Sequence, residues 1–422
     1  MRVLIINTAE RIGGAAIAAN RLMAALKNNG IKAKMLVRDK QTDQVTVVAL
    51  KKSWWHLWNF LWERCCILVA NRFKRHNLFA VDIANAGTDI TTLPEFKQAD
   101  VIHLHWINQG MLSLNNIKKI IDSGKPVVWT LHDMWPFTGI CHYAENCDKY
   151  TTHCSHCPKL YKGSRHDLSY KVFRKKEKLY NGINTRITFV ACSHWLEALA
   201  KKSYLAQRHT ITSIANPVNT NLFHPLNKKF IREKLNLPTD KKLLLFSSLK
   251  ITDKRKGIKY LVEACKILKE QKAEFCESLG VVVLGKESKQ YNELFPFSVY
   301  SLNYVNTEKE LAEIYNAVDL YVTPSLQDNL PNTIVEAMSC GIPCVGFNVG
   351  GIPQMIDHLH NGYVAQLKSA EDLANGIWWS LSEGNYATLS EIARHKAVNT
   401  YSEDIVASQF IKIYNQVTKK NA

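Results

Sequence analysis

Two carboxylates eight positions apart, Asp328 and Glu336, mark the segment of the sequence that most strongly indicates ligand chemistry. Pro331 and Asn332 lie between them and predict a change from loop to helix. We therefore expect Asp328 in the loop and Glu336 one or two turns into the helix, with both side chains pointing into one cleft. The neutral Asn329 and its neighbours leave the helix N-terminus available to an anion or to sugar oxygens.

A basic run, Lys254-Arg255-Lys256-Gly257, follows an expected strand at 243–247. Cations just before a helix suit a diphosphate leaving group, because negative charge accumulates on that group as its bond breaks. A charged run that merely faces solvent is the alternative, and the run alone does not decide between the two.

Two adjacent glycines, Gly13 and Gly14, follow an expected strand at 3–7 and precede a helix. Without Cβ atoms, they let backbone N–H groups approach an anion at the helix N-terminus. The surrounding sequence is not the G-x-G-x-x-G fingerprint, and no acidic residue ends a second strand about twenty residues on, which disfavours a nicotinamide dinucleotide. A plain tight turn explains the pair equally well.

A histidine, His132, stands with Asp133 at the carboxyl end of an expected strand at 127–131. Parallel α/β sheets bind ligands at the carboxyl ends of their strands, so His132 is expected to face the cleft and to hydrogen-bond a hydroxyl group. An isolated histidine is more often structural, and both interpretations stay open.

Four cysteines fall within seventeen residues, with the spacing C-x5-C-x6-C-x2-C: Cys141, Cys147, Cys154 and Cys157. Four thiolates can hold one tetrahedral zinc ion, which would fix a loop that has little core of its own. Residues 1–10 do not resemble an export signal, so metal binding is favoured over disulfides, with reduced thiols as the alternative. Such a zinc would be structural and would shape one side of the cleft.

Four of the ten tryptophans fall within nine residues: Trp54, Trp55, Trp58 and Trp62. Helical spacing gives three of them a common face, and basic clusters at 51–52 and 72–75 flank the segment. Aromatic rings between Lys and Arg clusters suit the interface of an anionic membrane, which we favour over the alternative of a core helix.

Positive charge is concentrated in the first half of the chain. Residues 1–215 hold 31 Lys and Arg against 15 Asp and Glu, whereas residues 216–422 hold 23 against 22. Anionic lipid, a phosphate-bearing acceptor or nucleic acid can each bind such a basic surface. The alternative is that the positive charge serves only to keep the protein soluble. No run reaches the roughly 18–20 apolar residues of a spanning helix. We expect a cytoplasmic protein, peripheral on the inner face of the membrane.

The elements that position these residues alternate along the 422-residue chain, as β-branched runs and helical stretches that indicate parallel sheets covered on both faces. Further strands are expected at 33–37, 101–105, 188–191, 280–284, 320–323, 343–347 and 363–365. Two prolines, Pro217 and Pro225, interrupt regular structure between the halves. We predict an α/β protein of two Rossmann-like, doubly wound domains, 1–215 and 216–401, facing a central cleft, with a last helix at 402–422 able to join the first domain.

The order of these motifs resembles the retaining GT-B glycosyltransferases of family 4. The resemblance covers essentially the whole chain and rests on motifs in a fixed order: Gly13-Gly14, His132-Asp133, Lys256-Gly257, Asp328 to Glu336 and Gly350-Gly351-Ile352-Pro353. Its specific part is the acid-x7-Glu element with the Gly-x-Pro that follows at 341–343.

The resemblance implies a role for each donor-side residue. Glu336 would hold the ribose hydroxyls of a nucleotide, and Asp328 would contact the donor sugar ring. Backbone groups near Asn329 and Leu330 would bind other sugar hydroxyls. Lys256 would meet the diphosphate.

For the remaining motifs the resemblance implies that His132 contacts the transferred sugar and that Gly13 and Gly14 lie by the phosphates and the acceptor. The catalytic residues would be His132, Asp328 and Lys256. The implied partners are a UDP- or GDP-sugar donor and a glycan or lipid-linked acceptor, in surface polysaccharide synthesis with retention of configuration. No cofactor would be required for catalysis.

Two positions depart from the family pattern. Asp328 stands where Glu is more usual, and the shorter side chain can alter the donor sugar accepted. The strand before the Lys-Gly motif lacks the arginine often found there, and Arg255 is expected to supply that charge.

The alternative functions are another GT-B nucleotide-sugar enzyme, such as an epimerase or phosphorylase, and a noncatalytic glycan- or nucleic-acid-binding protein. No nucleic-acid partner is expected, because the aromatic and basic residues form no recognised nucleic-acid motif and the acid-x7-Glu element would go unexplained.

Overall fold

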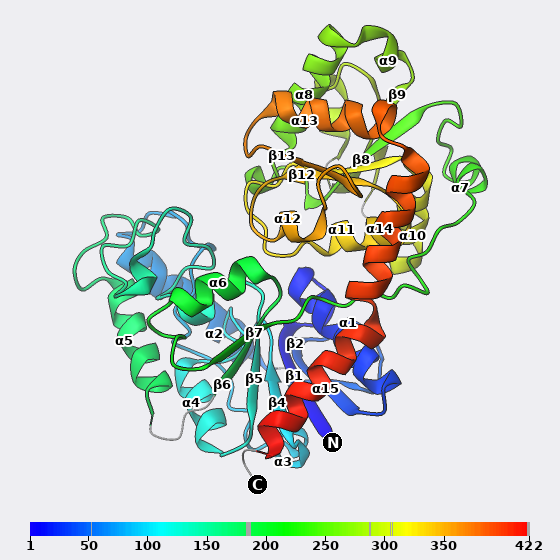
Figure 1. Cartoon of the computed structure of the whole chain (residues 1–422). Coiled ribbons are helices and arrows are strands. Elements are labelled where there is room, and N and C mark those ends of the chain that lie inside the picture. The colour runs from blue at the N-terminus through cyan, green and yellow to red at the C-terminus, as the bar shows by residue number, and fades with distance from the viewer. Residues whose placement is uncertain (52, 183–186, 287, 304, 306, 420–422) are drawn as a thin grey trace. The chain divides into compact units, whose positions relative to one another are not determined.

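The computed structural model of the protein describes residues 1–51, 53–182, 187–286, 288–303, 305 and 307–419. The chain divides into two compact units (Figure 1). Unit 1 comprises Met1–Ala215 and Val406–Ala422, and unit 2 comprises Asn216–Ile405. Lys52 of the basic cluster and residues 420–422 of the expected last helix lie outside the described residues.

Unit 1 is built on a parallel sheet of seven strands in the order β3-β2-β1-β4-β5-β6-β7. The strands are β1 (Arg2–Ala9), β2 (Lys32–Asp39), β3 (Val47–Ala49), β4 (Val101–Leu104), β5 (Val127–Leu131), β6 (Ile187–Ala191) and β7 (Thr210–Ser213). The order reverses between β1 and β4. Sheets of this kind bind ligands at the carboxyl ends of the strands next to such a reversal.

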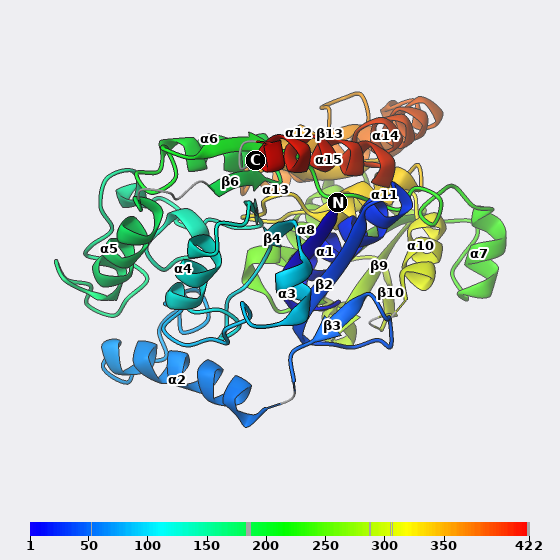
Figure 2. The ribbon, with the colours of Figure 1, turned by 90° about the horizontal axis from the view of Figure 1, so that it is seen from below.

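The sheet of unit 1 carries apolar side chains on both faces, because helices cover each side. Val3 and Ile5 of β1 pack with α1 (Gly14–Asn28) and α15 (Glu403–Lys419), whereas Leu4 and Ile6 face the opposite core. Figure 2 shows α2 (Trp54–Ala70) at the outer edge of the unit.

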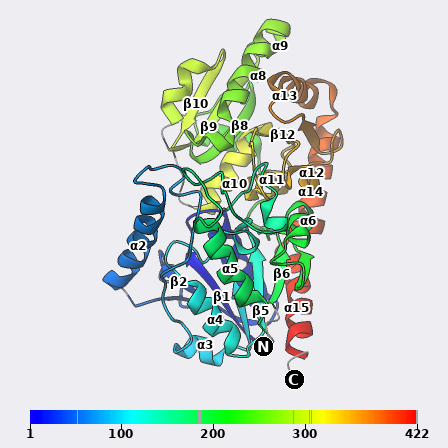
Figure 3. The same ribbon diagram turned by 90° about the vertical axis from the view of Figure 1, so that its left-hand side faces the viewer.

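The other helices of unit 1 are α3 (Pro94–Gln98), α4 (Leu114–Asp122), α5 (Leu168–Tyr180) and α6 (His194–Lys202). In Figure 3, α4 and α5 lie on the side of the sheet opposite to α15. Short 3-10 turns occupy Trp135–Phe137 and Lys149–Thr151.

Unit 2 contains a second parallel sheet, of six strands in the order β10-β9-β8-β11-β12-β13. The strands are β8 (Lys242–Lys250), β9 (Leu279–Lys286), β10 (Ser298–Leu302), β11 (Leu320–Thr323), β12 (Cys344–Phe347) and β13 (Gly362–Ala365). Here the order reverses between β8 and β11, which are direct neighbours with Leu244 opposite Leu320. Two doubly wound parallel sheets confirm the predicted fold class.

Helices cover both faces of the second sheet as well. They are α7 (Lys228–Lys234), α8 (Ile258–Gln271), α9 (Ala273–Glu277), α10 (Glu308–Ala317), α11 (Asn332–Ser339), α12 (Ile352–Met355), α13 (Ala370–Trp378) and α14 (Tyr386–Tyr401). Leu261 of α8 and Leu373 of α13 share one core with Leu244 and Val281 of the sheet. The helix α11 contacts α10, α14, β11 and β12. Short turns occupy Lys254–Lys256 and Ser288–Leu294, and a π-helical turn occupies Trp379–Glu383.

Three strands of the structure were not predicted from the sequence, namely β3, β7 and β10. All three lie at sheet edges. Most of their residues are partly or fully exposed. The strands β7 and β10 mix polar with apolar residues and so lack the continuous apolar run that identifies a central strand, whereas β3 is apolar but only three residues long.

The packing of α15 on unit 1 predicts a local stability effect. Phe410 of α15 is 2% exposed and belongs to the core that contains Val3 and Ile5. We expect Phe410→Ala to lower the unfolding free energy of unit 1 by about 3 kcal/mol, because it leaves a cavity. Denaturant unfolding measures this loss. The exposed neighbour Gln409→Ala is the control, and equal stability of the two variants would contradict the packing.

Candidate active site

An ion pair joins the two loops that follow β8 and β11. Lys256 Nζ lies 2.6 Å from Asp328 Oδ2, and Arg255 Nη1 lies 3.7 Å from the same oxygen. The backbones are also linked, since Leu326 N–H donates to the Arg255 carbonyl (2.8 Å) and Arg255 Nη1 donates to the Gln327 carbonyl (2.8 Å). Three residues singled out in the sequence therefore meet at the reversal point of the second sheet.

Gly257 allows the loops after β8 and β11 to approach closely, and Gly350 allows the loop after β12 to approach the loop after β11. Gly257 has a φ of 71°, and a Cβ atom there would lie 1.9 Å from the Pro324 carbonyl oxygen. Gly350 has a φ of 60°, and its Cβ would lie 1.7 Å from the Asp328 carbonyl oxygen. Both positions combine a left-handed backbone with space for glycine alone.

The charge of Asp328 is set by a balance of two opposing effects. Burial by itself raises the pKa of this carboxyl, whereas the adjacent Lys256 and Arg255 lower it, and the net pKa lies below the ordinary value. The two cations remain partly exposed, with 25% of the Lys256 side chain and 37% of the Arg255 side chain accessible. Both can therefore meet a ligand anion from solvent.

The second carboxylate, Glu336, lies within α11 and is 2% exposed. Its Oε2 accepts a hydrogen bond of 2.9 Å from the hydroxyl of Tyr315 on α10. Burial and the nearby carboxylate raise the pKa of Tyr315 well above the usual range, so this hydroxyl stays a donor. Asn329 and Leu330 are also buried, at 4% and 5%, in the loop before α11.

A row of three histidines lies at the ends of β4 and β5 in unit 1. His105 Nδ1 lies 2.9 Å from His132 Nε2. His103 Nδ1 and Nε2 lie 2.7 Å from the hydroxyls of Tyr414 and Thr130. Burial lowers the pKa of His103 to about 3 and that of His132 to about 4, although Asp133 opposes the shift at His132. His132 is therefore neutral near pH 7, and its second ring nitrogen, Nδ1, lies 3.6 Å from Cys192 Sγ.

Asp133 is fixed by three donors beside this row. Its Oδ1 accepts from Trp135 N–H (2.8 Å), and its Oδ2 lies 3.0 Å from Trp106 Nε1 and 2.7 Å from His142 Nδ1. His142 Nε2 lies 2.6 Å from Asp82 Oδ2. Burial alone would lower the pKa of His142, but the two carboxylates raise it to about 10. His142 thus bridges two aspartates as a cation.

The predicted glycine pair stands at the start of α1. Gly13 is the N-cap residue with a φ of 93°, and a Cβ there would have nothing within 4 Å. The backbone therefore runs past open space, as an approaching ligand group requires, although the left-handed φ also fits a plain turn.

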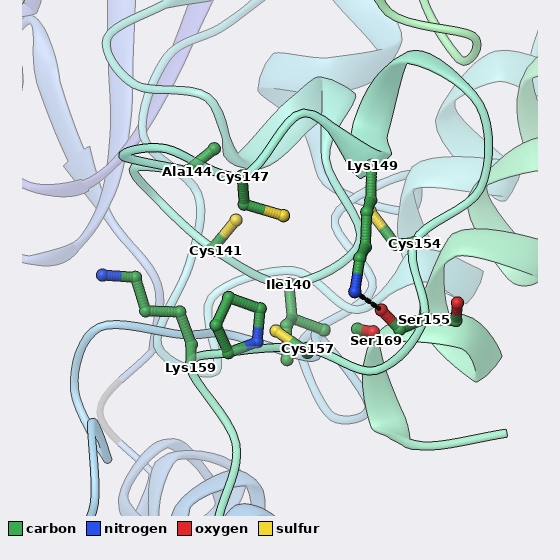
Figure 4. A pocket seen from close by; sticks show the side chains of 11 residues that line it. Ile140, Cys141, Ala144, Cys147, Lys149, Cys154, Ser155, Cys157, Lys159 and Ser169 are labelled. Atoms are coloured by element: carbon green, nitrogen blue, oxygen red, sulfur yellow. Dashed lines mark hydrogen bonds between the residues drawn. The ribbon is translucent and has the colours of Figure 1, made fainter. Parts of the chain in front are cut away.

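The four predicted zinc cysteines line one small cavity together with Lys149 and Lys159 (Figure 4). The cavity has a volume of about 20 Å³, which accommodates one water or one ion. As the side chains stand, no group of three or more His, Cys, Asp or Glu among the described residues is arranged to hold a metal. Zinc binding stays a prediction.

Sequence reasoning missed several residues that complete these sites. His103 lies within the apolar strand β4 and His105 directly follows it, and this alternation was a usable signal. Asp82 and Tyr315 gave no signal, because each lies far along the chain from the residue it contacts.

Comparison with known proteins agrees with the fold and with the order of the motifs. Residues 12–222 match the profile of Glycosyltransferase Family 4, and residues 227–396 match that of Glycosyl transferases group 1. Among solved structures, sucrose-phosphate synthase from Thermosynechococcus elongatus superposes with a TM-score of 0.66 at 17% identity, over 100% of both chains. Anabaena HepE in complex with UDP-glucose superposes with a TM-score of 0.62 at 17% identity, over 99% of this chain and 100% of that one.

The matches to curated relatives cover only about half of each chain. The N,N'-diacetylbacillosaminyl-diphospho-undecaprenol alpha-1,3-N-acetylgalactosaminyltransferase of Campylobacter jejuni is 27% identical over 48% of this chain and 53% of its own. The UDP-Gal:alpha-D-GlcNAc-diphosphoundecaprenol alpha-1,3-galactosyltransferase of Escherichia coli is 25% identical over 46% and 50%. The match to this chain spans about half the length of each relative.

The fold is that of a GT-B glycosyltransferase. The chain belongs to the group 1 glycosyltransferases, family 4, a family of transferase enzymes, which confirms the resemblance drawn from its motifs.

The bridging charge of His142 predicts a pH-dependent stability. A histidine titrates near pH 6.5 when unfolded, and here its folded pKa is about 10. The contribution of protonated His142 to the free energy of unfolding is therefore fully present below about pH 6.5 and is lost as the pH rises through about 10. We expect His142→Gln to be less stable than wild type by roughly 3 kcal/mol at pH 6, with the gap closing towards pH 10. Unfolding free energies across this range test it, and a pH-independent gap would contradict a charged His142.

Metal analysis of purified protein tests the cysteine cavity. We expect about one zinc per chain, lost in Cys141→Ser and Cys157→Ser because four thiolates complete the site. The exposed Cys65→Ser is the matched control and should keep the metal. A folded wild-type protein free of zinc would contradict the prediction.

Proposed function

We propose that this protein transfers a sugar from a UDP- or GDP-sugar to a glycan or lipid-linked saccharide acceptor, with retention of configuration. The observation that carries the proposal is the contact of Lys256 and Arg255 with Asp328 at the reversal point of the second sheet. Ligands of doubly wound sheets bind at this point. A nucleoside diphosphate brings the anionic group that two partly exposed cations can bind.

The cations act on the leaving group. As the bond between the anomeric carbon and the diphosphate oxygen breaks, negative charge grows on the diphosphate. Lys256 and Arg255 stabilise that charge, and the N-terminus of α11, whose first turn is uncharged, adds its positive dipole end. Because these cations and the helix N-terminus stabilise the leaving group, we propose that catalysis requires no metal ion.

The two carboxylates have separate tasks in this proposal. Asp328 holds Lys256 in place and contacts the donor sugar, with backbone groups of Asn329 and Leu330 binding further hydroxyls. Glu336 holds the ribose hydroxyls through a carboxylate already oriented by Tyr315.

His132 contributes from unit 1 as a neutral imidazole that hydrogen-bonds the transferred sugar, and Gly13 and Gly14 line the path of the phosphates and the acceptor. An acceptor hydroxyl attacks the anomeric carbon, and its proton passes to the departing diphosphate oxygen. The attack takes place on the face that the diphosphate leaves, through an oxocarbenium-like state, and so keeps the configuration. No protein nucleophile is assigned.

Relatives support the substrate class. The Campylobacter and Escherichia coli enzymes are named for acceptors carried on undecaprenyl diphosphate, and the latter for a UDP-sugar donor. HepE is solved with UDP-glucose. We place the reaction in polysaccharide or glycolipid synthesis on the cytoplasmic side of a membrane.

Donor turnover with a panel of UDP- and GDP-sugars tests the function. We expect Lys256→Ala to lower kcat by about 10²–10³, because it removes a charge that acts on the leaving group. Lys266→Ala on α8 removes the same charge at an exposed position and should leave kcat unchanged. Nucleotide binding without any turnover in wild type would indicate a noncatalytic binding protein and contradict the proposal.

Glu336→Gln tests the donor pocket separately. Loss of the charged acceptor should raise KM for the donor about tenfold while kcat changes less, since ribose binding is common to ground state and transition state. Tyr315→Phe, which removes the hydroxyl that orients Glu336, should shift KM in the same direction. A kcat loss with unchanged KM would contradict the assigned role.

A further inference from the structure

The helix α2 presents an unusual face to solvent. Of its seventeen residues, only Glu63, Arg64 and Ile67 are buried. Its large apolar side chains are exposed by 45% to 64%: Trp54, Trp55, Leu57, Trp58, Leu61 and Trp62. We call these six residues the tryptophan face. Side chains of this size and number together on the surface mark an interaction site.

The apolar surface continues beyond the helix. Val69 at its end is 53% exposed, and Phe73 and Phe79 in the following segment are 73% and 65% exposed. Trp54 stacks on Trp55 with ring centroids 3.8 Å apart, and Trp58 stacks on Trp62 at 6.1 Å. The aromatic rings are thus paired with one another and leave their outer sides open.

The charge around the tryptophan face is of one sign. Lys51 before the helix and Arg72, Lys74 and Arg75 after it are exposed cations. Glu63 is the acidic residue of the sequence 51–75, and it is fully buried. The accessible charge in this region is therefore positive, which favours a negatively charged partner.

The inner side of α2 holds the helix in place. Glu63 Oε1 accepts the N–H groups of Ile83 and Ala84 at 2.7 Å. Arg64 donates to the Leu78 carbonyl at 2.6 Å and pairs with Asp82. These contacts fix the helix without using its tryptophans.

The backbone of α2 also packs closely against the loop after β4. A Cβ atom at Gly110, in the loop after β4, would lie 2.8 Å from the backbone nitrogen of Phe60. The left-handed φ of 79° at Gly110 and this approach both require glycine.

We propose that α2 docks unit 1 on the surface of an anionic lipid bilayer, with the tryptophan face at the level of the headgroups and the flanking cations on lipid phosphates. Tryptophan favours this interface, and Lys and Arg near an anionic bilayer add attraction. No helix in the described ranges has the length and apolar character needed to cross a membrane. The helix therefore lies along the surface.

The docked helix is connected to the candidate site of its own unit. Arg64 pairs with Asp82, Asp82 contacts His142, and His142 contacts Asp133 beside His132. A chain of charged contacts thus links α2 to Asp133, the residue next to His132. This inference rests in part on the proposed function, because it names the surface where a lipid-linked acceptor would be met.

Co-sedimentation of the full-length protein with vesicles tests the docking. Wild type should pellet with vesicles of phosphatidylglycerol and phosphatidylethanolamine, and tryptophan fluorescence should shift to the blue. The triple variant Trp54→Ser, Trp58→Ser, Trp62→Ser should bind at least tenfold more weakly. Lys74→Glu with Arg75→Glu should weaken binding to anionic vesicles, and the attraction should decline in high salt.

The matched control is Phe230→Ser, which removes an aromatic ring that is 63% exposed in unit 2 and should pellet like wild type. All variants change exposed side chains, so their thermal unfolding should match wild type. Unchanged pelleting of the triple variant would overturn the proposal. So would a wild-type dimer that becomes a monomer in the triple variant without vesicle binding, since the face would then hold a second copy.

Donor turnover in free solution separates this inference from the proposed function. The triple variant should retain wild-type turnover of the soluble donor while losing vesicle binding, which would support both. Vesicle binding that depends on the tryptophans in a protein with no transferase activity would support the docking and reject the transferase assignment.

Discussion

The ion pair of Lys256 and Arg255 with Asp328 holds together the loops after β8 and β11, on which the proposed donor site depends. Neighbouring parallel strands end side by side, so the loops after β8 and β11 meet without long excursions. Gly257 removes the steric barrier between them, and the Asp328 carboxylate keeps its charge because two cations lie next to it. The cations in turn are held in position while part of each side chain stays accessible. Pre-positioned charge of this kind can stabilise a leaving diphosphate without reorganisation.

In unit 1 two histidines ten positions apart take different charge states, one neutral and one positive. Burial keeps His132 neutral, with a pKa of about 4, whereas Asp82 and Asp133 keep His142 protonated, with a pKa of about 10. The neutral ring suits contact with sugar hydroxyls, and the charged ring ties loops from distant parts of the chain. Local environment, and not residue type, assigns these two roles.

Much of the fold could be predicted from the sequence. The central strands carry continuous apolar runs, whereas the edge strands β7 and β10 mix polar with apolar residues and β3 has only three residues. On the donor side, Lys256 and Asp328 were each identified by residue type and spacing. Their contact could not be predicted, because 72 positions separate them and only the strand order brings them together. Tyr315 was missed for the same reason.

The segment at 54–62 shows which properties follow from the sequence and which depend on the tertiary structure. The sequence by itself determined that the segment is a helix with its tryptophans on a common face. Tertiary structure decided which face is buried, and it is the polar one. Glu63 and Arg64 point inwards because Asp82 and the backbone groups of the neighbouring segment satisfy them, which offsets the cost of removing two charges from water. With those partners inside, the tryptophans remain on the surface.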